Sequence, residues 1–295
     1  MHRKSQVAVR AQHHQTVALP CKGLGRIQHN YGSVGTNPIG TSVTTGASAG
    51  TKTSPATQLI ASTNFDAYWI IVTASNYAVA TTASRGAMDI MIGGATEDVL
   101  IPNLLFGNCG GVSSTAKKGM KSWGFPLYIP SGTRIAAAAC GDRTSTAVGI
   151  GVYLIGGDGY PPWKLGSKVV TYGIGSLPAG TAITPGTSGA EQGTGTQLTA
   201  STTEAHFAFL PSFQESGTTI NLRNYTMDLG IGAATEDWIE SSWWFSCDSN
   251  EAMDGPVPNM PVFVDVPAST RMALRVSNNG TSDGSVYECA LHAVS

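Results

Sequence analysis

The feature that most constrains this chain is an internal repeat with a shift of 139 residues. The segment TQLIAST at 57–63 recurs as TQLTAST at 196–202, and MDIMIGGATED at 88–98 recurs as MDLGIGAATED at 227–237. A near-constant shift over separate blocks is the signature of a tandem duplication. Whatever fold one copy adopts, we expect the other copy to adopt as well.

Each copy has the pattern of short, half-buried β-strands. In 88–92, Met88, Ile90 and Ile92 fall on one face of an extended strand, and 227–231 keeps apolar residues at the same alternate positions. A period of two is typical of strands with one face on a core, and the 36 glycines and 15 prolines suit many turns. We therefore predict a β-sandwich for each copy, with a jelly roll as the favoured topology. The predicted core positions are Met88, Ile90, Ile92, Leu104, Phe106, Met227, Leu229, Ile231 and Phe245.

The chain of 295 residues is long enough for two domains, because domains cluster at about 100–150 residues. We predict an all-β protein of two tandem jelly-roll-like sandwich domains, at 37–156 and 178–295, joined by a linker at 157–177. Residues 1–36 match nothing in the second copy, lack helical periodicity and carry several glycines, so we predict an extended basic arm.

Charge is distributed unevenly along the chain. The first 52 residues hold six basic residues and no acidic one, whereas 157–295 hold five basic and fourteen acidic residues. Such polarity is common in subunits that dock one end on a partner, although it can equally serve solubility. The basic residues lack interleaved aromatics, which argues against nucleic-acid binding, and no apolar run approaches the ~20 residues that span a membrane. The arm residues predicted to contact a neighbour are Arg3, Lys4, Arg10 and Arg26.

A trio of carboxylates recurs in both copies, as Asp89, Glu97 and Asp98 and again as Asp228, Glu236 and Asp237. Three interpretations are open: a structural turn, a weak calcium site built from hard oxygen ligands, or a pair of hydrolytic carboxylates. We favour the structural turn, because both copies keep the trio at the same place relative to the strands. The matching residues Arg134 and Arg271 could pair with this turn or with a neighbouring subunit.

Other chemistry has little support in the sequence. It contains no HExxH, GxSxG or phosphate-loop motif, and its five cysteines form no CxxC pair. We therefore expect no catalytic residue, no cofactor and no metal site beyond the weak calcium candidates. Trp123 and Trp163 lie outside the repeated strands and could stack on a sugar ring.

A further repeated pair consists of FPLYIPSGTRIA at 125–136 and MPVFVDVPASTRMA at 260–273. Together the repeated blocks resemble the jelly-roll modules of structural proteins in tailed-bacteriophage virions, over residues 37–295. The resemblance implies a capsid decoration protein or a head-fibre or tail-appendage subunit, without enzymatic activity. It also implies a homo-oligomer, most often a trimer, assembled in the host cytoplasm into the virion. The arm would then bind another capsid or tail protein. Many such proteins have one module, whereas this chain has two.

An alternative function is a carbohydrate-binding adhesin, which attaches a particle to glycans on the host surface. The two functions can be combined in one protein.

Overall fold

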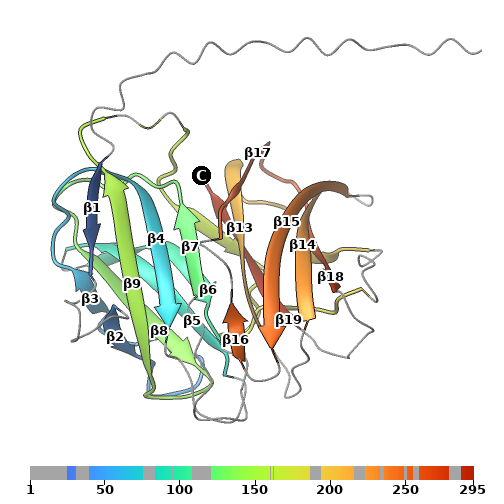
Figure 1. The fold of residues 1–295 in the computed structure, drawn as a ribbon, viewed down its shortest axis with the longest axis horizontal. Helices are drawn as coiled ribbons and strands as arrows, with labels where there is room; N and C mark the ends of the chain where they lie inside the picture. The colour runs from blue at the N-terminus through green and yellow to red at the C-terminus, as the bar shows by residue number, and fades with distance from the viewer. Residues whose placement is uncertain are drawn as a thin grey trace, which may run out of the picture.

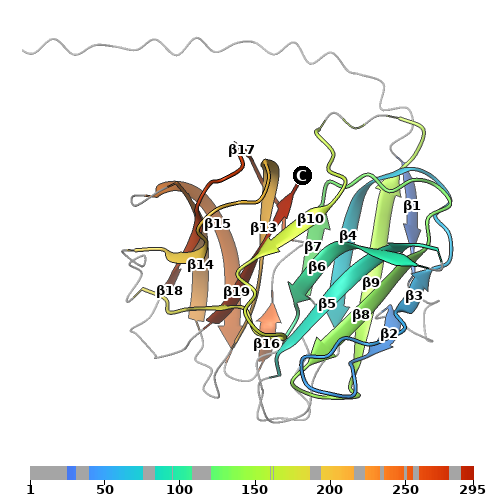
Figure 2. The same ribbon diagram turned by 180° about the vertical axis from the view of Figure 1, so that it is seen from behind.

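The computed structural model describes residues 25–30, 40–75, 84–94, 96–107, 121–159, 161, 163–186, 194–215, 223–232, 236–248, 251–254, 259–278 and 287–295. Every regular element in these residues is a β-strand. Within them no helix is long and apolar enough to span a membrane. The strands form two units along the chain, each built from two sheets (Figures 1 and 2).

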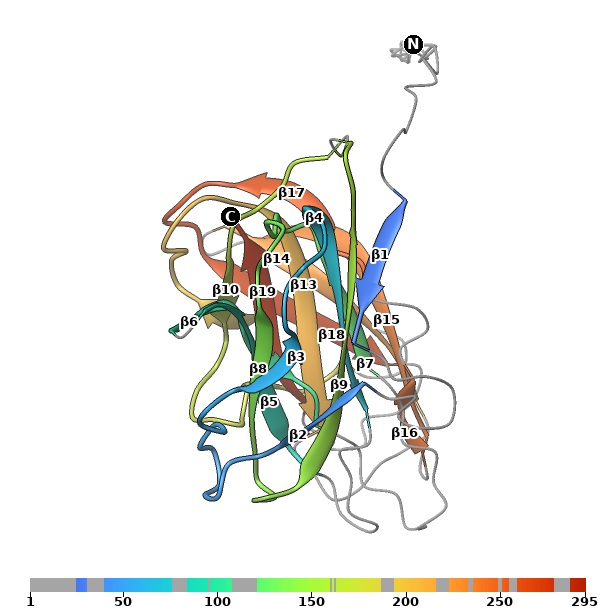
Figure 3. The ribbon, with the colours of Figure 1, turned by 90° about the vertical axis from the view of Figure 1, so that its left-hand side faces the viewer.

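In its described residues the first unit contains nine strands in two sheets. They are β1 (Arg26–His29), β2 (Thr41–Thr44), β3 (Thr57–Ile60), β4 (Ala67–Ser75), β5 (Gly86–Gly93), β6 (Glu97–Leu105), β7 (Lys121–Phe125), β8 (Ile135–Gly141) and β9 (Ala147–Gly156). One sheet has the order β1-β9-β4-β7, with β2 also on β9, and the other has the order β3-β8-β5-β6. Figure 3 shows them as separate layers. From β2 to β9, this order is that of an eight-stranded jelly roll.

The second unit repeats the order. Its strands are β10 (Val169–Tyr172), β11 (Thr181–Ile183), β12 (Thr196–Thr199), β13 (His206–Glu215), β14 (Arg223–Ile231), β15 (Asp237–Asp248), β16 (Glu251–Asp254), β17 (Val262–Val266), β18 (Met272–Asn278) and β19 (Tyr287–Val294). One sheet is β10-β19-β13-β17, with β11 on β19, and the other is β12-β18-β14-β15-β16. The prediction of an all-β fold with two tandem jelly-roll-like sandwiches is confirmed.

The predicted core is largely confirmed. Residues Met88, Ile90, Leu104, Phe106, Met227 and Leu229 are buried. Ile92 and Ile231 are partly buried and pack against the cores of their units. The side chain of Phe245 lies outside the described residues. The alternating pattern thus placed these strands correctly, because one face of each strand packs on its own core.

Two short strands correct the sequence analysis. β1 lies in the segment predicted as an arm and β10 in the segment predicted as a linker, and each pairs antiparallel with the last strand of its unit. Ile27 faces Ile155, while Val169 faces Val294 at the equivalent position. Strand β1 within the predicted arm therefore has a counterpart, β10, in the second copy. Sequence similarity misses it because backbone hydrogen bonds, rather than shared side chains, define the equivalence.

The two units pack against each other through different surfaces. The outer face of sheet β10-β19-β13-β17 lies against the side of the first unit where β6 and β7 end its two sheets (Figures 1 and 2). Phe207, Ala208, Leu210 and Val294 of the second unit belong to the same buried cluster as the first unit's core. The apolar interior of the first unit thus extends onto the outer face of the second unit, whose own core is a separate cluster.

Candidate functional site

The repeated glutamate of the first unit is part of a three-residue cluster. Arg134, directly before β8, forms an ion pair with Glu97 at the start of β6. Its Nε donates a hydrogen bond to Oε1 of Gln58 on β3, at 3.2 Å. The guanidinium thereby connects both edge strands of the sheet β3-β8-β5-β6 across its end. The first unit thus follows the structural interpretation, with arginine and acidic turn paired within the chain.

The second unit contains the same cluster. Arg271 forms an ion pair with Glu236, and its Nε donates to Oε1 of Gln197 at 2.8 Å. Burial raises the pKa of Glu236, but the hydrogen bond and charge of Arg271 act against it, and the pKa lies below its usual value. A carboxylate stabilised in its charged form is a poor proton donor. This cluster is therefore suited to tying strands together.

The repeated aspartates are buried beside different cations. Oδ1 of Asp89 lies 2.5 Å from Nζ of Lys52 and accepts the backbone N–H of Asn103 at 2.8 Å. Oδ2 of Asp228 lies 3.1 Å from a terminal nitrogen of Arg275. Both copies keep the acid, but its partner comes from a loop in the first and from β18 in the second.

The structure does not gather the calcium candidates into a cation site. Asp98 and Asp237 are exposed, while the other four carboxylates each face a lysine or arginine. Among the described residues, no three His, Cys, Asp or Glu side chains meet as a metal would require. Ion pairing within each sheet separates these groups from one another.

The two predicted sugar-stacking tryptophans occupy different environments. Trp123 on β7 is 1% exposed and lies in the core, so the prediction that it contacts glycans is wrong. Its alternation with Phe125 and Leu127, both buried, is the signal that could have placed it inside. Trp163 is 36% exposed and meets the ring of Trp69 edge to face, with centroids 5.9 Å apart.

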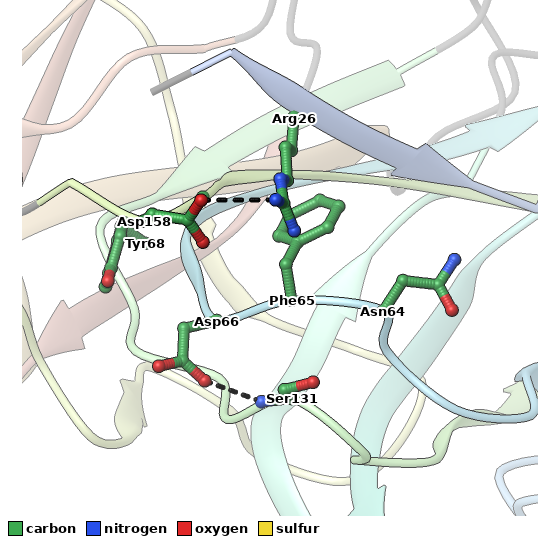
Figure 4. A pocket seen from close by; sticks show the side chains of 8 residues that line it. Arg26, Asn64, Phe65, Asp66, Tyr68, Ser131 and Asp158 are labelled. Atoms are coloured by element: carbon green, nitrogen blue, oxygen red, sulfur yellow. Dashed lines mark hydrogen bonds and ion pairs between the residues drawn. The ribbon is translucent and has the colours of Figure 1, made fainter. Parts of the chain in front are cut away.

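An open pocket of about 450 Å³ lies at one end of the first unit. Figure 4 shows Arg26 and Asp158 on one side, joined at 3.1 Å, and Asp66 accepting the backbone N–H of Ser131 at 2.8 Å on the other. Its remaining lining residues are Asn64, Phe65, Tyr68 and Gly157. The volume is within the range of small-ligand sites, and its polar groups could hydrogen-bond a hydroxylated ligand.

The chemistry of this pocket is confined to the first unit. The positions of Asp66 and Tyr68 are taken by Ala205 and Phe207 at the repeat shift of 139. Ring stacking of Tyr68 with the exposed Tyr128, 6.1 Å between centroids, adds an aromatic surface beside the pocket. Sequence analysis missed this site, because its residues come from four separate segments.

Of the predicted arm residues, only Arg26 is described. It begins β1, pairs with Asp158 of its own unit and lines the pocket. Arg26 thus has an ion pair within its own chain, and its contact with a neighbour stays a prediction. Arg3, Lys4 and Arg10 lie outside the described residues.

A chain of hydrogen bonds crosses the contact between the units at the fully buried His292. Its Nε2 lies 2.7 Å from Ser212 Oγ, and its Nδ1 lies 2.9 Å from Thr171 Oγ1. Thr171 donates to the carbonyl of Pro102 at 2.5 Å, and Ser212 accepts the N–H of Leu105 at 3.0 Å. These roles assign the proton of the neutral ring to Nδ1, with Ser212 donating to Nε2. Burial lowers the pKa of His292 to about 3.

Gln214 forms a second polar connection in the same contact. Its Oε1 accepts the N–H groups of Gly86 and Gly107 at 3.0 and 3.1 Å, and its Nε2 donates to Pro178 O and to Glu288. A side chain at Gly107 would collide with Gln214, since a Cβ there would lie 2.3 Å from Oε1. Every polar atom of this buried amide has a partner, as a stable buried contact requires.

Two further residues join this network from the first unit. Arg85 donates to Glu288 at 3.1 Å, and Nζ of the buried Lys121 donates to the carbonyls of Phe213 and Gly107. On the other side of the contact, Thr171 and Ser212 of the second unit satisfy backbone groups at Pro102 and Leu105. These groups lie on the edge strand β6, which would otherwise be open to pairing. The contact between the units is the most elaborate polar constellation in the described part of the chain. Ser212 and His292 lie on strands that the sequence predicted, whereas Thr171 lies on β10 in the predicted linker, and only the packing of the two units brings these residues together.

No protein-family model matches the sequence, and no curated protein matches it either. Among solved structures, the chain is similar to PNGF-II, with a TM-score of 0.34 and 9% identity over 87% of this chain. It spans 65% of the length of that protein. It is also similar to the tandem CBM22-1-CBM22-2 domain of Paenibacillus barcinonensis Xyn10C, with a TM-score of 0.24 and 9% identity over 92% of both chains.

A third similar structure is that of the infectious bursal disease virus Gx strain, with a TM-score of 0.18 and 11% identity over 79% of this chain and 58% of that one. Likenesses at this level carry no conclusion about what this protein does.

Proposed function

We propose that this protein is a non-enzymatic structural subunit of a virion that works by assembling side by side with other jelly-roll units. The observation that carries the proposal is the contact between its two units. There the outer face of one sandwich buries the open side of another, with His292 and Gln214 fully hydrogen-bonded inside it. A jelly roll whose sheet face is built to pack on a neighbour is suited to a shell or an appendage.

The carboxylates support a structural role. Glu97 and Glu236 are paired with arginines at equivalent places, and Asp89 and Asp228 are paired with Lys52 and Arg275. A hydrolytic pair would need two carboxylates facing each other across an open site, with one kept protonated. The contacts of these four carboxylates do not match that arrangement, because each one faces a lysine or arginine rather than a second carboxylate.

The more specific proposal is a capsid decoration protein or head or tail appendage of a tailed phage, present as a homo-oligomer. The repeated blocks support it through their resemblance to such modules, which implies a trimer. The six basic residues among the first 52 are suited to binding an acidic capsid or tail protein. We propose that residues 1–24, which precede β1, provide this attachment.

The test is to locate the protein in particles purified from the virus that encodes it, by mass spectrometry and immunogold labelling. A variant lacking residues 2–24 retains β1, and we expect it to form folded oligomers that are absent from the particles. Absence of the full-length protein from purified particles would overturn the virion assignment. Normal incorporation of the shortened protein would overturn the role of the arm.

Glycan binding at the pocket of the first unit is the second candidate function. It is favoured by the polar lining around Asp66 and Asn64 beside the stacked Tyr68 and Tyr128. On a glycan array we expect binding that is lost in Asn64→Ala and in Tyr128→Ala. The matched control is Phe263→Ala, since Phe263 is similarly exposed but belongs to the second unit. Binding that survives both pocket substitutions would exclude this site.

A further inference from the structure

The same four positions on the outer sheet face are apolar in both units. In the second unit they are Val169, Ala208, Leu210 and Val294, all buried against the first unit. The strand registers assign their first-unit equivalents, which are Ile27, Trp69, Ile71 and Ile155. An apolar outer face is unusual, because the face of an antiparallel sheet that meets water is normally polar.

In the first unit this face is partly open to solvent, and Trp163 covers part of it by packing edge to face on Trp69. Ile27 is 62% exposed, while Trp69, Ile71 and Ile155 are partly exposed. The pairings Ile27–Ile155 and Trp69–Ile155 place three of these side chains in one row across β1, β9 and β4. We name these four residues the first-unit face. A contiguous apolar patch of this kind marks an interaction surface.

In the second unit, the surface equivalent to the β7 side of the first unit has no further unit as its neighbour among the described residues. The pairings Ile70–Phe125 and Phe209–Val262 fix the equivalence of β7 and β17 at a shift of 137. In the first unit Trp123, Phe125 and Leu127 are buried. Of their equivalents, Met260 is 54% exposed, and both Val262 and Val264 are partly exposed. We name these three residues the second-unit side.

We propose that the first-unit face of one copy binds the second-unit side of another copy, which repeats between chains the contact made within each chain. The proposal rests on the proposed assembly function and identifies the surface that assembly uses. Such a contact is heterologous, so successive copies form a closed ring or an open filament.

Charge and geometry support this occupant. Residues 25–156 hold eight basic and five acidic residues, whereas 157–295 hold five basic and fourteen acidic residues, so a first unit and a second unit of different copies attract each other. The internal contact also predicts which residues meet. Phe125 and His292 have ring centroids 6.2 Å apart. Their equivalents place Val262 of one copy against Tyr153 of the next.

The test uses purified protein and analytical ultracentrifugation. Ile27→Glu alters the face and Met260→Glu alters the side, and we expect each to weaken self-association at least ~10-fold. Val99→Glu is the matched control, because Val99 is an exposed apolar residue of the first unit outside the face. Self-association of Ile27→Glu as strong as that of the wild-type protein would overturn the proposal. A wild-type protein that stays monomeric at the concentrations at which virions assemble would overturn it as well.

Mixing the two variants gives a sharper result. The Ile27→Glu copy keeps its second-unit side and the Met260→Glu copy keeps its first-unit face, so we expect a 1:1 dimer that grows no further. A contact between identical surfaces would give no such dimer. As a second readout, Tyr153→Cys in one copy should cross-link to Val262→Cys in another, and a mixture with Val99→Cys in place of Val262→Cys should not.

This test is independent of the virion assignment. Dimers in the mixture together with absence from particles would support the contact and overturn the proposed function. Presence of the protein in particles, together with no dimer in the mixture of the two variants, would support the proposed function and overturn the contact.

Discussion

The two units have the same strand order but use the same sheet face differently. In the second unit the face is buried and combines a small residue, Ala208, with polar groups such as Ser212 and His292. In the first unit the corresponding residues are Trp69, Thr73 and Tyr153, and the end of the face near β1 is exposed. The duplication therefore kept the framework of each sandwich and varied the side chains according to what each face contacts.

The largest expected effect comes from one pair of equivalent residues. Leu210→Ala should lower the free energy of unfolding by about 2–5 kcal/mol, because the side chain is fully buried between the units. Ile71→Ala at the same place in the first unit should cost less than ~1.5 kcal/mol, because Ile71 is partly exposed. Urea denaturation of both variants measures the difference. Equal costs would mean that the two faces are equally covered.

The second prediction concerns pH, and it separates His292 from its counterpart Tyr153. Burial lowers the pKa of His292 from an ordinary 6.5 to about 3, so between these values the unfolded chain binds more protons than the folded one. Stability should therefore fall as the pH drops, by about 2 kcal/mol between pH 7 and pH 5 from this residue.

Urea denaturation at several pH values checks this, and His292→Gln should remove most of the slope. A smaller slope of the same sign should remain, because burial also lowers the pKa of His206. A variant that keeps the full acid sensitivity would show that the buried histidine is not its source.

The third prediction tests whether the two arginine clusters are equivalent. Glu97→Gln and Glu236→Gln should each lower the free energy of unfolding by about 1 kcal/mol, since each loses the ion pair with its arginine. Neither should abolish any enzymatic activity. Thermal denaturation gives the first result, and a hydrolytic assay with glycans gives the second. Loss of measurable hydrolysis in either variant would contradict a purely structural cluster.

The smallest effect should appear at β1. Arg26→Ala should change stability by less than ~0.5 kcal/mol, because its ion pair with Asp158 is exposed on both sides. Val169→Ala in the equivalent strand β10 should cost more, because Val169 is buried between the units. Differential scanning calorimetry of the two variants compares them. A larger effect at Arg26 would mean that β1 depends on this ion pair.

The repeat predicted the fold well but could not predict the contact between the units. Alternation of apolar residues placed Met88 and Met227 inside, because a strand side chain either faces its own core or faces away. Leu210 and Ile71 face away, and nothing in their alternation distinguishes a face that meets another unit from one that meets solvent. The same limit applies to the pocket near Asp66, which is formed by segments distant in sequence.

The edge of β6 has a consequence for how the chain is made. Its backbone groups at Pro102 and Leu105 are satisfied by side chains of β10 and β13, and β19 contributes His292 to the same contact. During translation, the first unit is complete when β9 has emerged, yet β19 follows only after synthesis of more than a hundred further residues. At about 5–20 residues per second this interval lasts roughly seven to thirty seconds. For that period the nascent first unit carries an open edge strand, and neighbouring ribosomes on one messenger would bring such edges close together.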